Sequence, residues 1–108
     1  MTSIQLLYQR KTQAGHTALS KLSPGGGPPP HIQTREHEGF YVTEGEITFM
    51  VDKQRIEAKP GTFVNIPPNV LHSFKNETNE IAKVVGILSP SGFEQFFVEV
   101  GVRFQIST

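Results

Sequence analysis

Residues 38–76 read EGFYVTEGEITFMVDKQRIEAKPGTFVNIPPNVLHSFKN, a succession of short segments rich in β-branched and aromatic side chains. Such side chains favour strands, whereas Gly, Pro, Asn and Asp favour the turns between them. Within this stretch, Pro60 precedes Gly61 in the order that a type II turn prefers. The stretch therefore predicts a series of strands joined by tight turns, at residues 38–43, 46–51, 54–58, 62–66 and 71–76.

The same pattern continues on both sides of this stretch. Further strands are predicted at residues 3–9, 16–22 and 82–89. Only residues 91–100, SGFEQFFVEV, differ, because their aromatic side chains recur at the three-to-four spacing of a helix. The chain of 108 residues is therefore predicted to form one all-β domain, residues 1–108, with a short C-terminal helix.

Composition excludes several classes of function. Lys and Arg together number 10, as do Asp and Glu, so the formal net charge is zero. A chain with zero net charge is not attracted to a polyanion, so nucleic-acid binding is not expected. Because the sequence contains no cysteine, a metal would have to take nitrogen and oxygen ligands. No segment approaches transmembrane length and the N-terminus lacks the pattern of a secretory signal, so we expect a cytoplasmic protein without membrane contact.

Candidate metal ligands lie in two short segments. His31 and Gln33 are two residues apart, so they project from the same face of a strand. After a turn at residues 34–36, Glu38 can return to that face from the next strand. His72 lies in the strand predicted over residues 71–76. Two imidazoles, an amide oxygen and a carboxylate form a donor set that a divalent metal accepts.

The two segments resemble the two motifs of the cupin superfamily, G-x5-H-x-H-x3,4-E-x6-G and G-x5-P-x-G-x2-H-x3-N. The matching positions are Gly25, His31, Glu38 and Gly45 in the first motif, and Gly61, Pro67, His72 and Asn76 in the second. Two positions differ: Gln33 stands where a second histidine is usual, and Asn69 where a glycine is usual. Asn tolerates the left-handed conformation of such a turn glycine, so the second difference is benign. The segment PPPHIQTREHEGFYVTEGEITF, residues 28–49, further resembles the quercetinase-like single-domain cupins.

The resemblance implies a double-stranded β-helix, the jelly-roll barrel of cupins, with one divalent metal ion per chain. It implies His31, Glu38 and His72 as metal ligands, while Gln33 is a weaker, neutral donor that either coordinates the ion directly or orients a water. Iron, manganese, nickel and zinc are the candidate ions, and oxygen donors favour manganese or iron. His37 is an alternative ligand, although it should face the opposite side of its strand from Glu38.

Two functions are compatible with such a site. The first is a metal-dependent dioxygenase or related oxidoreductase that acts on a small apolar or aromatic substrate, with Glu38 as the catalytic base. The second is a non-catalytic module that binds a small molecule or senses a metal, in which Gln33 marks a weakened site.

The remaining predictions concern the interior, one further histidine and the assembly. The resemblance implies a homodimer, for which residues 3–9 and 102–106 are the candidate contacts. His16 is predicted to be structural unless its side chain reaches the pocket. The residues predicted to line the interior are Phe40, Val42, Phe49, Phe63, Phe74, Val85 and Ile87.

Overall fold

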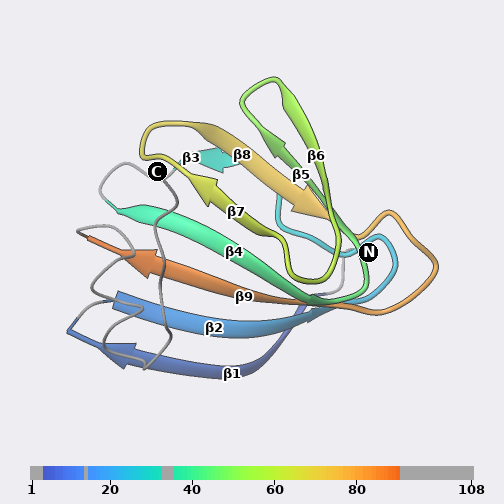
Figure 1. Ribbon diagram of the computed structural model, residues 1–108, viewed down its shortest axis with the longest axis horizontal. Helices are drawn as coiled ribbons and strands as arrows, with labels where there is room; N and C mark the ends of the chain where they lie inside the picture. The colour runs from blue at the N-terminus through green and yellow to red at the C-terminus, as the bar shows by residue number, and fades with distance from the viewer. Residues whose placement is uncertain (1–3, 14, 33–35, 91–108) are drawn as a thin grey trace.

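The computed structural model describes residues 4–13, 15–32 and 36–90, which form strands and no helix (Figure 1). The strands are β1 (Ile4–Thr12), β2 (Gly15–Leu22), β3 (His31–Ile32), β4 (His37–Glu44), β5 (Ile47–Val51), β6 (Gln54–Ala58), β7 (Phe63–Ile66), β8 (Leu71–Lys75) and β9 (Ala82–Ser89). In these ranges no helix is long and apolar enough to span a bilayer. The helix predicted over residues 91–100 lies outside the described residues.

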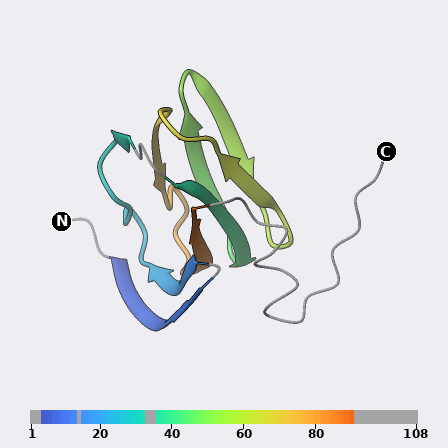
Figure 2. The ribbon, with the colours of Figure 1, turned by 90° about the vertical axis from the view of Figure 1, so that its left-hand side faces the viewer.

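Two antiparallel sheets make up the described fold, one with the strand order β1-β2-β9-β4-β7 and the other with the order β3-β8-β5-β6. From β2 to β9 the chain crosses repeatedly from one sheet to the other, so that strands distant in sequence become neighbours, such as β2 and β9 (Figure 1). Figure 2 shows the two sheets facing each other around a common interior. The predicted jelly-roll architecture is confirmed.

Three phenylalanines from both sheets form the centre of the core. Phe40 in β4 lies 4.8 Å from Phe74 in β8 and 5.4 Å from Phe49 in β5, measured between ring centroids. All three are almost completely buried. Tilted aromatic rings at this separation attract each other beyond the burial of their surface. The buried apolar residues of the described chain are Leu22, Phe40, Val42, Ile47, Phe49, Ala58, Val64, Ile66, Phe74, Ala82, Val84 and Ile87.

The predicted interior is correct for β4, β5 and β8 and partly wrong for β7 and β9. Phe63 is 37% exposed, because β7 turns Val64 and Ile66 inward and Phe63 therefore faces outward. In β9, Ile87 is buried as predicted, whereas Val85 is only half-buried. Both residues lie on the outer face of the strand. Alternation of side chains fixes these faces once one inward residue of the strand is known, and the sequence alone does not give that residue.

Residues of the two motifs shape turns as well as the candidate site. Gly25, Gly45 and Gly61 all have φ between 72° and 92°, a conformation that glycine adopts at no steric cost. Asn69, at the position where glycine is usual, has φ of 68°, so the prediction that asparagine substitutes for that glycine is confirmed. This turn sets the start of β8, the strand that carries His72.

Candidate metal centre

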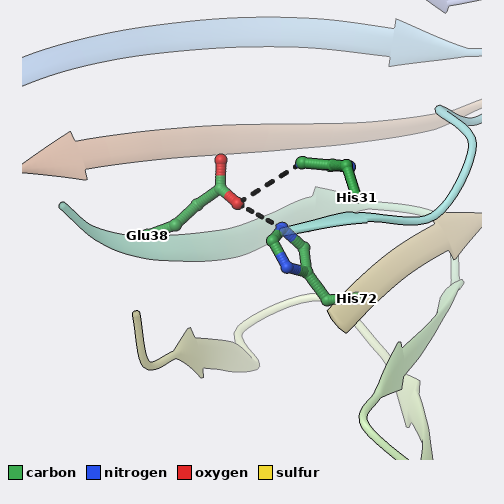
Figure 3. Close-up of side chains that lie close together, drawn as sticks. All are labelled: His31, Glu38 and His72. Atoms are coloured by element: carbon green, nitrogen blue, oxygen red, sulfur yellow. Dashed lines mark hydrogen bonds and ion pairs between the residues drawn. The ribbon is translucent and has the colours of Figure 1, made fainter. Parts of the chain in front are cut away.

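Three strands bring the candidate ligands together at one end of the fold. Strands β3 and β8 pair so that His31 lies directly opposite His72, with ring centroids 4.2 Å apart and ring planes inclined by 58°. Glu38 approaches from β4 in the other sheet, where its carboxylate lies beside both imidazoles (Figure 3). The remaining predicted ligand, Gln33, lies outside the described residues.

The donor atoms of the three side chains converge. Oε1 of Glu38 contacts Nε2 of His72 and lies 3.8 Å from Nε2 of His31 (Figure 3). One donor atom from each of the three residues lies within 4.8 Å of the others. Ligands about 2.0–2.2 Å from a shared ion are at most about 4.4 Å apart, so small movements of the side chains would bring all three donors onto one ion. The geometry is therefore compatible with one ion between the three groups.

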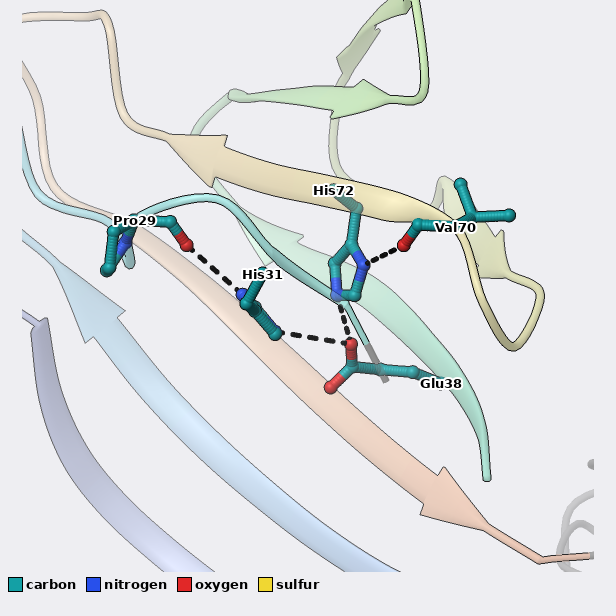
Figure 4. A network of polar contacts seen from close by, with 5 residues as sticks. All are labelled: Pro29, His31, Glu38, Val70 and His72. Carbon is teal, nitrogen blue, oxygen red and sulfur yellow. Dashed lines mark hydrogen bonds and ion pairs between the residues drawn. The ribbon is translucent and has the colours of Figure 1, made fainter. Parts of the chain in front are cut away.

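Backbone carbonyls hold both imidazoles in one orientation. Nδ1 of His72 donates a hydrogen bond to the carbonyl oxygen of Val70 at 3.0 Å, and Nδ1 of His31 donates to the carbonyl oxygen of Pro29 at 3.1 Å (Figure 4). Since a carbonyl oxygen only accepts, each Nδ1 carries the proton, and in the neutral ring Nε2 keeps its lone pair. Both Nε2 atoms are thus prepared to bind an ion on the side of Glu38.

The electrostatics of this arrangement favour a bound cation. Two imidazole lone pairs and a carboxylate oxygen that face one another repel unless a positive charge lies between them. A divalent ion supplies that charge. When no ion is bound, a proton shared between Glu38 and His72 supplies it instead. Burial strengthens the effect, because His72 and Glu38 have side chains only 1% and 11% exposed.

Access to the centre is from the side of His31. Its side chain is 42% exposed, in contrast to the buried His72 and Glu38. On the sheet that carries Glu38, the directly paired residues are Ile66 in β7 and Leu88 in β9. A ligand at the centre therefore meets apolar side chains on both sides of the carboxylate.

The other two histidines do not join this group. His37 precedes Glu38 in β4 and so projects to the opposite face. His16 forms a hydrogen bond with Gln9, in which its Nε2 lies 3.0 Å from the Gln9 side-chain oxygen. Among the described residues, the group of His, Asp and Glu that could hold an ion comprises His31, Glu38 and His72.

Sequence reasoning missed the two carbonyl groups that orient the histidines. Every residue carries a carbonyl, so Pro29 and Val70 give no signal of this role in the sequence. In both cases the acceptor is two residues before the histidine, which makes the contact a local consequence of the turn that precedes the strand.

Comparison with known proteins identifies the family. Residues 18–88 match the cupin domain. The chain belongs to the cupin family. Both halves of the candidate centre, His31 with Glu38 and His72, lie within the matched region.

Two quercetin 2,3-dioxygenases resemble this cupin in sequence. The enzyme of Bacillus subtilis (strain 168) is 34% identical over 98 residues, which cover 90% of this chain and 29% of the enzyme. The enzyme of Aspergillus japonicus is 28% identical over 79 residues, which cover 68% of this chain and 22% of the enzyme. The cupin thus spans less than a third of the length of either relative.

A solved structure supports the fold. The protein TT1209 from Thermus thermophilus superimposes with a TM-score of 0.72 at 20% sequence identity, over 82% of each chain. At this identity the likeness concerns the fold alone.

Proposed function

We propose that this cupin is a metal-dependent dioxygenase that acts on a small aromatic substrate bearing an enolic hydroxyl group. The observation that carries the proposal is the orientation of the two imidazoles, whose Nδ1 atoms are bound to backbone carbonyls while both Nε2 atoms face Glu38. Histidine ligands in metalloproteins are commonly held in this way by a hydrogen bond from the second ring nitrogen.

The ligand set proposed for one divalent ion is His31, Glu38 and His72, with Gln33 as a fourth contributor. Two histidines and one carboxylate are the set found in many non-haem iron oxygenases, and they leave coordination positions open. When bound, the ion would stabilise the deprotonated oxygen of the substrate and, if redox-active, promote its reaction with O₂. Iron and manganese suit the oxygen-rich donor set, whereas zinc or nickel remain compatible with the imidazoles.

When it does not coordinate the ion, Glu38 is proposed to accept the substrate proton. Its carboxylate oxygen lies between the two imidazoles and is almost completely buried, so a hydroxyl group that enters from the exposed side of His31 would meet it directly. A carboxylate within hydrogen-bond reach of a hydroxyl can accept its proton as a general base.

The proposed substrate class rests on two observations. The residues paired with Glu38 across its sheet are Ile66 and Leu88, which favour an apolar or aromatic body. In addition, the relative of Bacillus subtilis that is 34% identical is a quercetin 2,3-dioxygenase. Quercetin, an aromatic molecule with an enolic hydroxyl group, is therefore the first compound to test.

A non-catalytic binding module is the second candidate function. The observation that favours it is Gln33, whose neutral amide oxygen binds a metal more weakly than the imidazole usual at that position of the motif. In this version the site holds an ion weakly and the pocket binds or senses a small molecule without turnover.

Metal analysis and oxygen consumption distinguish the two candidates. Protein purified without chelator or affinity metal is analysed for its elements and then mixed with quercetin in air-saturated buffer. The dioxygenase predicts close to one ion per chain and loss of quercetin in step with O₂. Ion content far below one per chain, without turnover after metal is added back, contradicts the dioxygenase and favours the module.

Gln33→His provides a matched variant for the same assay. Replacement of the amide by imidazole is expected to tighten metal binding about tenfold or more. His37→Gln is the control, because His37 projects away from the candidate centre. Equal metal affinity in wild type and Gln33→His would exclude Gln33 from the coordination sphere.

We also propose that this cupin is a homodimer. Strand β1 lies at the edge of its sheet and exposes several large apolar side chains, namely Ile4, Leu6, Leu7 and Tyr8. Exposed edge strands with such side chains tend to pair with another chain. The other candidate contact, residues 102–106, lies outside the described residues.

A further inference from the structure

One polar pair lies on the same sheet face as the candidate metal centre and has no part in it. In the five-stranded sheet, His16 of β2 is paired with Leu88 of β9, and Leu88 is paired with Glu38 of β4. Residues directly opposite each other on neighbouring strands project to the same face. His16, Leu88 and Glu38 therefore form a row across the inner face of the sheet.

The length of this row follows from strand spacing. Neighbouring strands are about 4.8 Å apart, so His16 and Glu38 are separated by roughly 10 Å between their Cα atoms. Leu88 lies between them and is only partly buried. The row thus has a polar group at each end and an apolar residue in the middle.

His16 is held in place by its neighbour on the edge strand. The side-chain oxygen of Gln9 accepts a hydrogen bond from Nε2 of His16 at 3.0 Å. The neutral ring then keeps Nδ1 as an acceptor for a hydroxyl group. Lys11, which is paired with His16 in β1, is exposed and adds a positive charge beside the ring.

Two of the three residues of the row are partly exposed, namely His16 and Leu88. Of the inward residues of β2, Leu22 at the end of the strand is completely buried, whereas Ala18 and His16 are only partly buried. The adjacent inward position in β9 is Gly86, over which the ring of Phe40 packs, since a Cβ at Gly86 would lie 3.2 Å from that ring. The partly buried His16 and Leu88, together with the exposed His31, make the row accessible from solvent.

We propose that His16, positioned by Gln9, is a second substrate-binding group that selects flat phenols with a hydroxyl group far from the reacting end. One oxygen of the ligand lies at Glu38 and the histidines, its rings lie over Leu88, and a distal hydroxyl donates to Nδ1 of His16. This inference rests on the proposed function, since it takes the candidate metal centre as the reacting end. It goes beyond that function by assigning specificity to a residue outside both cupin motifs.

The test compares two ligands on Zn²⁺-loaded protein, in which no redox turnover competes with binding. Quercetin carries hydroxyl groups on all of its rings, whereas 3-hydroxyflavone keeps the enolic hydroxyl and lacks the others. Dissociation constants are measured by absorbance titration for wild type, His16→Phe and Gln9→Leu. The control is Thr17→Val, because Thr17 lies on the opposite face of β2.

Loss of one hydrogen bond predicts a selective effect. In His16→Phe, quercetin should bind about three- to tenfold more weakly while the affinity for 3-hydroxyflavone stays the same. Gln9→Leu keeps the imidazole but not its anchor, and it should lose part of the same preference. Zn²⁺ content should not change in any of these variants, since none alters a candidate ligand.

Three results separate the possible failures. If His16→Phe and Gln9→Leu both keep the wild-type preference for quercetin, the role of His16 is refuted and the proposed function stands. Equal weakening of both ligands would also refute it, because that result indicates a structural role. If wild-type protein binds Zn²⁺ but neither ligand, both the role of His16 and the proposed substrate class are overturned.

Discussion

Replacement of Asn76 by alanine should destabilise the fold without affecting the candidate metal centre. Asn76 ends the second motif and is completely buried. Its side-chain nitrogen donates to the carbonyl oxygens of Leu22 at 3.0 Å and Glu80 at 2.6 Å. Its side-chain oxygen accepts from the backbone nitrogen and the hydroxyl of Thr78, at 3.0 and 2.7 Å. The amide therefore connects the end of β2 to the turn between β8 and β9.

The expected loss follows from these four contacts. The Leu22 carbonyl belongs to a completely buried residue, so leaving it without a partner costs about 1–3 kcal/mol. The partners at Thr78 and Glu80 lie nearer the surface and regain hydrogen bonds from water, so their share is smaller. We expect Asn76→Ala to lower the free energy of unfolding by about 2–4 kcal/mol. The corresponding fall in Tm is roughly 10–20 °C.

Urea unfolding followed by circular dichroism measures this loss, and Asn79→Ala is the control. Asn79 lies in the same turn but is exposed, so its replacement should change stability by less than about 0.5 kcal/mol. His72 is four residues before Asn76, roughly 13 Å along an extended chain, so metal content per folded chain should not change. A loss for Asn76→Ala as small as that for Asn79→Ala would refute the assigned role.

Two further predictions concern a motif glycine and the assembly. Gly45→Ala should destabilise the fold more than Gly61→Ala, because a Cβ at Gly45 would lie 2.6 Å from the carbonyl oxygen of Ile81, whereas no atom lies within 4 Å of a Cβ at Gly61. Gly61→Ala should cost only the strain of a positive φ, about 1–2 kcal/mol. Equal losses of stability in thermal unfolding would contradict this reasoning. Light scattering should give the mass of a dimer for wild type and of a monomer for Tyr8→Lys, which places a charge on the exposed strand β1; a monomeric wild type would contradict the proposed homodimer.

The sequence predicted the strands and the turns well, because both leave local signals. Positive φ at Gly45, Gly61 and Asn69 explains why these positions of the motifs carry glycine or asparagine. The alternation that places His72 and Phe74 on one face of β8 was equally readable. Asn76, the last position of the second motif, holds the turn between β8 and β9 through the hydrogen bonds of its amide.

Two aspects of the structure could not be read from the sequence. In β9, apolar residues occupy both faces, so the pattern does not reveal that Val84 faces inward and Val85 outward. The row from Glu38 through Leu88 to His16 depends on strand pairings between residues far apart in the chain, for which one sequence gives no signal. This explains why His16 was predicted to be structural, whereas its register places it on the face of the candidate centre.

Anomalous diffraction from a crystal grown with Mn²⁺ tests directly whether one ion binds between His31, Glu38 and His72. We expect one strong peak per chain, within bonding distance of Nε2 of His31, Nε2 of His72 and a carboxylate oxygen of Glu38, and no such peak in a crystal of Glu38→Ala. Clear density for the three side chains with no peak between them, at a Mn²⁺ concentration that saturates ordinary sites, would contradict it.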